Sequence, residues 1–435
     1  MKSSLIIAAG TLVRPALLVF ALTLSVGSGI AYGQPSRNTT TLGSTAQTLI
    51  DYARQSNAGF AAARAEAAAA SERVTPAGAL PDPSFEVELM DATNTMSGRS
   101  ASLLPGQVGE TRYRITQPLP GWGKRKLAVE AAEAQARQAD AVKETVWSDL
   151  ATKIETLWLK YYSADRELAL AKQGLALLQG LEETSLVRYK TGRLPQQAVL
   201  RMQREITAQR IALVEIEQRR KGLAAGLNGL IGRTPDSPLD APAEPPPLPE
   251  RLVIDSLFDA LMNANPEVNV ATFGIEAARA ERARTYQDRL PDFAVGLRNS
   301  RPDGRRASWD VMFEVTIPLQ QSSRRAKERE AEQMLLAAEA RREDARSRAA
   351  GELGTAWSMY AQGSETLRLL ENTLVPQAQA TRDASRAALA SGAVDFDNVI
   401  EAERQLIDIR GQRLKVEVEA RLALIEIKKL TGELK

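Results

Sequence analysis

The second half of this chain repeats the first, and the repeat constrains the possible fold more than any other feature of the sequence. Along the helical stretches, matching residues recur 200 positions apart, as Pro118-Leu119 and Pro318-Leu319 do. An earlier pair, Leu80-Pro81-Asp82 and Leu290-Pro291-Asp292, is 210 positions apart, so the second copy lacks ten residues in a loop between these anchors. This pattern predicts one structural unit that is built twice.

A proline-rich segment separates the two copies. Seven prolines between positions 235 and 249 exclude a helix and predict an extended linker. We expect the first copy to cover residues 34–233, the linker 234–250 and the second copy 251–435.

Each copy begins with the same predicted elements. A helix comes first, over about 46–73 and 266–289, and a proline soon follows it. A β-hairpin comes next, over about 84–118 and 292–318, because apolar and polar residues alternate there.

A long coiled-coil hairpin completes each copy, over about 122–232 and 322–432. Its first helix would extend about 100 Å, and a turn at Gly192 or Gly392 would reverse the chain. The returning helices carry apolar residues at heptad spacing, which predicts a coiled coil. These residues are Val199, Met202, Ile206, Leu213, Ile216, Leu223, Leu227 and Leu230 in the first copy, and Val399, Ala402, Leu406, Ile409, Val416, Ala420, Ala423, Ile427 and Leu430 in the second. The heptads alone would fit an ordinary helical bundle.

The predicted hairpins point to a membrane barrel that several chains share. Two hairpins give only four strands per chain, whereas closed membrane barrels begin at about eight strands. Four strands with one apolar face would leave two unpaired edges and an exposed apolar surface. The alternating runs are shorter than the roughly 9–11 residues that cross a bilayer, unless flanking residues extend the pairing. The predicted fold is therefore mainly α-helical with a small β-barrel portion, and its helix, β-hairpin and coiled-coil unit is duplicated.

The first residues have the pattern of a secretory signal peptide. Lys2 supplies positive charge, an apolar run extends over 16–26, and Ala31-Tyr32-Gly33 places small residues before a cleavage site. We expect residues 1–33 to be this signal. The alternative is a membrane anchor helix, for which the apolar run is short.

The composition argues against most catalytic chemistries. The chain contains neither Cys nor His, so it has no thiol nucleophile, imidazole base or usual zinc ligand. A carboxylate enzyme is the catalytic alternative, but no Glu or Asp pair stands out, and we predict that the chain is not an enzyme and needs no cofactor. The 56 basic and 54 acidic residues nearly cancel, which gives no reason to expect a nucleic-acid partner.

Three groups of residues resemble the TolC-like outer-membrane efflux family. They are Gln117-Pro118-Leu119-Pro120 with Gly123-Lys124-Arg125, then Arg188-Tyr189-Lys190-Thr191-Gly192 with Val199-Leu200, and Ser391-Gly392 with Val399-Ile400-Glu401-Ala402. Their order and duplication carry the resemblance, which covers essentially the whole chain after residue 33. Gly123-Lys124-Arg125 is also similar to the heavy-metal-efflux branch.

The resemblance implies a homotrimer with a 12-stranded barrel in the outer membrane of a Gram-negative bacterium and an α-helical tunnel in the periplasm. It also implies a passive channel that works with a periplasmic adaptor protein and an inner-membrane pump, in efflux or type I export. The chief alternative is a periplasmic coiled-coil adaptor or scaffold without a pore.

The same resemblance implies two sets of site residues. Adaptor contacts would lie at the helical turns, at Arg188, Tyr189, Gly192, Leu200, Gly392 and Ile400. A narrow gate would lie after the second turn, at Asp395, Asp397, Asn398 and Glu401. The family often has an Asp-x-x-Asp pair there, and in this chain that spacing gives Asn398 and Glu401, so one carboxylate is missing. Asp395 and Asp397 could restore an acidic ring. The alternatives are that the glycines only cap helices and that the acidic residues only cap a helix start.

Overall fold

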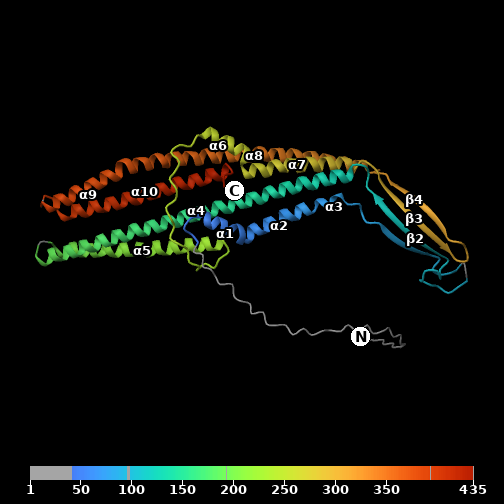
Figure 1. Ribbon diagram of the computed structural model, residues 1–435, viewed down its shortest axis with the longest axis horizontal. Helices are drawn as coiled ribbons and strands as arrows, with labels where there is room; N and C mark the ends of the chain where they lie inside the picture. The colour runs from blue at the N-terminus through green and yellow to red at the C-terminus, as the bar shows by residue number, and fades with distance from the viewer. Residues whose placement is uncertain (1–41, 96–97, 193, 392, 435) are drawn as a thin grey trace, which may run out of the picture. The chain divides into compact units, whose positions relative to one another are not determined.

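The computed structural model describes residues 42–95, 98–192, 194–391 and 393–434. The expected signal peptide lies outside these residues. The described part of the chain contains the same series of elements twice (Figure 1). The first series is α1 (Ala46–Ser56), α2 (Ala58–Glu72), α3 (Val74–Gly78), β1 (Ser84–Met90), β2 (Glu110–Leu119), α4 (Lys124–Lys190) and α5 (Gln196–Leu230). The second is α6 (Ile254–Ala264), α7 (Pro266–Gln287), β3 (Asp292–Pro302), β4 (Ser308–Thr316), α8 (Gln321–Leu369), η1 (Leu370–Leu374), α9 (Val375–Ala390) and α10 (Phe396–Leu430). The predicted mainly helical, duplicated fold is confirmed.

The structure adds three breaks that the sequence did not predict. The predicted first helix of the first copy is divided at Asn57 into α1 and α2, and in the second copy the unpredicted helix α6 stands before α7 as α1 stands before α2. The second long helix passes through a π-helical segment, η1, just before Pro376, whereas α4 is continuous over the matching positions. Proline lacks an N–H and crowds the carbonyl four residues earlier, so a wider turn at this point accommodates Pro376.

The helices form one layer of four columns. α5 and α2 lie end to end in the first column, α4 is the second, α10 and α7 lie end to end in the third, and α8 with α9 is the fourth. Each column packs against the next, and among the described residues the first column makes no extended contact with the fourth. The layer is therefore open along two sides, one formed by α5 and α2 and the other by α8 and α9.

One asparagine joins the two helices of each end-to-end column. Asn57 accepts a hydrogen bond from the Phe60 N–H at 2.8 Å and donates one to the Leu230 carbonyl at 2.8 Å. In the second copy, Asn265 accepts from the Val268 N–H at 3.0 Å and donates to the carbonyl of Leu430 at 3.0 Å. The same side chain thus caps the start of one helix and the end of another, which satisfies backbone groups that helix ends leave unpaired.

The hydrophobic core lies where these joints meet the long helices. Large aromatic residues of α4 dominate its first part, including Trp147, Trp158 and Tyr162, and they pack with residues of α1, α5 and α10. A second part gathers residues of α6, α8 and α10. No helix in the described ranges combines the length and the apolar composition needed to cross a bilayer.

The four strands form one antiparallel sheet in the order β1-β2-β3-β4. This order matches the order of the columns, because α3 leads toward β1, β2 into α4, α7 into β3 and β4 into α8. The connection from β1 to β2, residues 91–109, is longer than that from β3 to β4, residues 303–307, and this is the loop that the second copy shortens. The strands β1 and β4 are the edges of the sheet and have one partner strand each.

Candidate functional site

One face of the sheet is apolar and exposed. Residues that pair across the strands point to the same face, so the pairings of Phe85 with Ile115 and of Val295 with Phe313 bring apolar side chains into rows. Phe313 is 80% exposed and Phe85 64%. β2, β3 and β4 contain 10, 11 and 9 residues, which matches the roughly 9–11 residues of a strand that crosses a bilayer, while β1 contains 7. The face has the length and chemistry of a lipid contact.

Tryptophans mark both ends of this apolar face. Trp122 follows β2 at the end nearest the helices, is 86% exposed and packs against Phe293 with 6.1 Å between ring centroids. Trp309 lies at the start of β4, at the opposite end, and is 67% exposed. Exposed aromatic residues at two levels are typical of the two interfaces between a bilayer and water. Sequence reasoning missed both tryptophans, although their positions next to strand ends were visible.

The opposite face of the sheet carries charges in register. A row across all four strands consists of Glu86, Arg114, Arg298 and Asp310. Arg114 is 3.1 Å from Glu86, and Arg298 is 3.0 Å from Asp310. Charged rows on one face and apolar rows on the other are what a barrel with a water-filled interior requires.

Ion pairs tie α7 to α8 just below the sheet. Tyr286 Oη and Arg282 Nε each donate a hydrogen bond of 2.8 Å to Glu332 Oε1, and these contacts hold the pKa of Glu332 below its ordinary value. Arg289 donates to both carboxylate oxygens of Glu328 and lowers the pKa of that group in the same way. These contacts join α7 and the residues that follow it to the first part of α8.

The first helical turn presents exposed side chains around Gly192. This glycine has a φ of +71°, the left-handed conformation that ends a helix in a tight reversal. Tyr189 is 43% exposed and Leu200 is 56% exposed, while Arg188 is partly buried. Both turns lie at the end of the helical layer away from the sheet (Figure 1).

The second helical turn differs from the first in the burial of one predicted adaptor contact, Ile400. Gly392 lies outside the described residues, and Ile400, which matches Leu200, is only 8% exposed. The predicted gate residues all follow this turn and are exposed: Asp395, Asp397, Asn398 and Glu401. Asp395 is the N-cap residue of α10 but makes no side-chain capping hydrogen bond, which leaves its carboxylate facing water.

An ion pair links the two coiled-coil hairpins near these turns. Arg404 Nη2 on α10 donates a hydrogen bond of 2.9 Å to Glu205 Oε2 on α5. Gly174 of α4 lies nearby between the two helices, since a Cβ there would be 3.3 Å from Gln209 Nε2 and 3.7 Å from Ile407 Cδ1. Nothing in the sequence alone connected Glu205 with Arg404, because the contact depends on how the columns are ordered.

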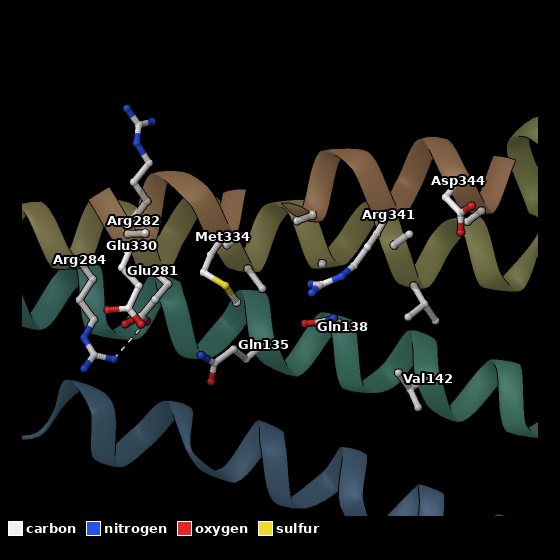
Figure 2. A pocket seen from close by; sticks show the side chains of 18 of the residues that line it. Gln135, Gln138, Val142, Glu281, Arg282, Arg284, Glu330, Met334, Arg341 and Asp344 are labelled. Atoms are coloured by element: carbon white, nitrogen blue, oxygen red, sulfur yellow. Dashed lines mark hydrogen bonds and ion pairs between the residues drawn. The ribbon is translucent and has the colours of Figure 1, made fainter. Parts of the chain in front are cut away.

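A groove of about 990 Å³ lies along α7 between α4 and α8 (Figure 2). Small residues of α7 line its floor, including Ala271, Gly274 and Ala278. Met334 and Arg341 of α8 point across it toward α4, and its charged residues include the pair Glu281 and Arg284, 3.3 Å apart. The lining mixes charged, amide and small apolar groups, which suits a hydrated wall. Within the described ranges, no cluster of three or more acidic side chains could hold a metal ion.

Comparisons with known proteins agree with this geometry. The sequence model of the outer membrane efflux protein family matches residues 49–233 and 257–433, one match for each copy of the repeat. No curated protein matches the chain.

Solved structures share the fold at low sequence identity. A membrane protein from Pseudomonas aeruginosa superposes with a TM-score of 0.74 at 16% identity, covering 90% of this chain and 91% of that one. VceC from Vibrio cholerae has a TM-score of 0.72 at 17% identity, with coverages of 89% and 96%. CusC has a TM-score of 0.70 at 18% identity, with coverages of 93% and 95%. Because the family model matches more than half of the sequence, in both copies of the repeat, the chain belongs to the outer membrane efflux protein family.

Proposed function

We propose that this outer-membrane protein is a passive homotrimeric conduit through which an inner-membrane pump discharges its cargo to the cell exterior. The observation that carries the proposal is that the sheet and the helical layer both have two open sides. A four-stranded sheet with an exposed apolar face and two unpaired edges continues into a helical layer that is also open on both sides. Three such walls would give a 12-stranded barrel in the membrane, with the charged rows facing water, and a helical tunnel in the periplasm.

The protein as a whole tests this proposal. We expect the detergent-solubilised protein to have the mass of three chains and to add discrete ion conductance steps to a planar bilayer, because a closed 12-stranded barrel encloses water. Mass measurement by light scattering and single-channel recording would show both properties. A monomer that stays soluble without detergent would contradict the conduit and favour a scaffold.

The helical turns are the proposed contacts with the periplasmic adaptor. Arg188, Tyr189 and Gly192 in the first copy and Gly392 in the second would form this surface. The other two predicted contacts, Leu200 and Ile400, are the fifth residues of α5 and α10, and the burial of Ile400 suits a role in packing next to the turn.

A charge at the first turn should uncouple the channel from its pump. We expect Tyr189→Glu to reduce efflux at least tenfold while trimers still reach the outer membrane, because Tyr189 is 43% exposed and belongs to neither of the two core clusters. Tyr52→Glu is the matched control, since Tyr52 is 41% exposed and lies on α1, remote from the turns. Efflux and outer-membrane abundance would be measured together, and equal efflux by the two variants would remove Tyr189 from the adaptor surface.

The acidic residues after the second turn are the proposed gate. Three copies of Asp395, Asp397 and Glu401 around a narrow axis would concentrate negative potential and favour cations. We expect Asp395→Asn with Asp397→Asn to lower the cation-to-anion permeability ratio severalfold, as read from the reversal potential in a salt gradient. An unchanged ratio would leave these residues as a solvated helix start.

A further inference from the structure

An arginine lies on the apolar face of the sheet, at the end that is remote from the helices. Tyr113 and Trp309 share one row across the strands, and Arg301 belongs to the next row, further from the helices. Arg301 is on the same face as Phe293, because residues an even number of positions apart along a strand point to the same side. A guanidinium group therefore lies just beyond the level of Trp309, on the side assigned to lipid.

Two side chains hold this guanidinium in place. Arg301 Nε donates a hydrogen bond of 2.9 Å to Asn299 Oδ1, and the guanidinium lies over the Tyr113 ring, 5.6 Å from the ring centroid. Asn299 is only 4% exposed and donates a hydrogen bond of 3.2 Å to the Ser308 carbonyl, so the acceptor is itself fixed. These contacts use Nε and one face of the guanidinium. They leave its two terminal nitrogens, Nη1 and Nη2, to bind an anion.

The arginines on the opposite, charged face of the sheet are held by carboxylates instead. The ion pairs are Arg112 with Glu110 at 2.8 Å, Arg114 with Glu86 at 3.1 Å and Arg298 with Asp310 at 3.0 Å. Within the described ranges, Arg301 forms no such pair. Because a positive charge beside lipid is unfavourable without a counter-charge, its position indicates an anion that comes from outside the chain.

The loop between β1 and β2 adds apolar groups on the same side. The Gly106 N–H donates a hydrogen bond of 3.0 Å to Thr111 Oγ1, and Thr111, which pairs with Arg301, is 1% exposed. The loop therefore covers the apolar side of the sheet next to Arg301. It also exposes two leucines, Leu103 at 79% and Leu104 at 59%. Exposed apolar groups beside a guanidinium suit the boundary between acyl chains and headgroups.

The turn between β3 and β4 adds further positive charge at this end. Arg305 and Arg306 are exposed, and neither forms an ion pair with another residue that the structure describes. Asp303, the acidic residue of the same turn, is already paired with Arg99 at 2.8 Å. An excess of basic residues at a membrane surface attracts the phosphate groups of anionic lipids.

We propose that Arg301 binds a phosphate group of a phosphorylated glycolipid in the outer leaflet, namely the lipid A part of lipopolysaccharide. Arg301 lies at the end of the sheet remote from the periplasmic helices, and the outer leaflet on that side carries phosphorylated sugars. A guanidinium can donate two parallel hydrogen bonds to one phosphate, which matches its free terminal nitrogens. The proposal rests on the assignment of the apolar face to lipid in the proposed conduit.

Lipid binding by the purified trimer tests this site. Native mass spectrometry of detergent-solubilised trimers, mixed with increasing amounts of bisphosphorylated lipid A, would measure the affinity. We expect Arg301→Gln to weaken binding about tenfold, because the charge-assisted hydrogen bonds to phosphate are lost. Arg301→Lys keeps the charge without the paired donors and should have an intermediate affinity. Equal affinities of the wild type and Arg301→Gln would overturn the site.

The matched control is Arg298→Gln, three residues away on the same strand. Arg298 lies on the charged face, where it pairs with Asp310, so its replacement removes the same charge on the side away from lipid. This variant should bind lipid A as the wild type does. Equal weakening by both substitutions would show that net charge, and not the position of Arg301, determines binding, and would overturn the proposal.

Two other lipids identify the occupant. Lipid A without its phosphates should bind about tenfold more weakly than the bisphosphorylated form, and Arg301→Gln should not weaken it further, since Arg301 then has no anion to bind. Cardiolipin has two phosphates on glycerol and no sugar. Lipid A should bind more tightly, because its phosphates stand on two sugar rings, so that one can bind Arg301 while Arg305 and Arg306 attract the other. Equal binding of cardiolipin would overturn the glycolipid as the occupant.

Conductance separates this site from the proposed conduit. In planar bilayers of phospholipid alone, Arg301→Gln should form channels with the conductance of the wild type, because Arg301 lies on the face away from the water-filled interior. If both proteins conduct as trimers but bind lipid A equally well, the site is wrong and the conduit stands. A wild-type protein that forms no conducting trimer would overturn the conduit, and with it the assignment of this face to lipid.

Discussion

Phe313→Arg is expected to abolish insertion into the outer membrane. Phe313 lies in the middle of β4 on the apolar face and is 80% exposed, so an arginine there would sit in lipid. An arginine at this depth costs about 2–4 kcal/mol per chain in a β-barrel, and three chains would each carry it. Outer-membrane abundance after fractionation should fall at least tenfold.

The matched control is Met312→Arg, one residue away on the same strand. Because successive side chains of a strand point to opposite faces, Met312 lies on the charged face, where it pairs with Gly296. An added arginine there would meet water and should leave insertion near the wild-type level. Equal loss for both variants would contradict the assignment of the two faces to lipid and water.

Gly432→Ala is expected to have the largest effect on stability among substitutions of the left-handed glycines at the helix ends. Gly432 has a φ of +70°, and a Cβ there would lie 2.4 Å from the carbonyl oxygen of Ala264. Left-handed backbone alone costs an L-residue about 1–2 kcal/mol, and here the overlap would in addition force α10 away from the α6 end. The apparent Tm of the purified protein, followed by circular dichroism, should fall sharply.

Two other glycines provide an ordered comparison. Gly192 has a φ of +71° with no atom within 4 Å of the added Cβ, and Gly232 has a φ of +73° with the Ser56 carbonyl oxygen at 3.1 Å. Alanine should therefore lower the Tm least at Gly192, more at Gly232 and most at Gly432. Equal decreases in Tm for all three variants would mean that backbone strain dominates. The contact between Gly432 and Ala264 would then tolerate the extra methyl group.

The sequence was sufficient to predict the fold class because the repeat and the alternation are local signals. Residues such as Val311, Phe313 and Val315 alternate with polar neighbours, which defines a strand with one apolar face without any knowledge of its partners. The missing ten residues likewise identified the shorter hairpin loop. The turn at Gly192 follows from the need for a left-handed residue at a helix reversal.

The details that sequence reasoning missed depend on contacts between distant segments. The break at Asn57 is explained only when the Leu230 carbonyl lies beside it, 2.8 Å from the side-chain nitrogen. The different burial of Leu200 and Ile400 follows from the order of the columns, which the repeat alone does not define. The roles of the turn and gate residues stay predictions, because they concern partners rather than the fold of this chain.

The π-helical segment at Leu370–Leu374 gives the two hairpins different mechanics. α4 is one continuous α-helix of 67 residues, so the hairpin of α4 and α5 is stiff along its length. The second has a weak point partway along its length, where hydrogen bonding is rearranged and Pro376 follows. In an assembly of such chains, continuous α4–α5 hairpins would alternate with α8–α10 hairpins that contain η1. Bending near the helical turns would then be confined to every second hairpin, and the other hairpins would keep their shape.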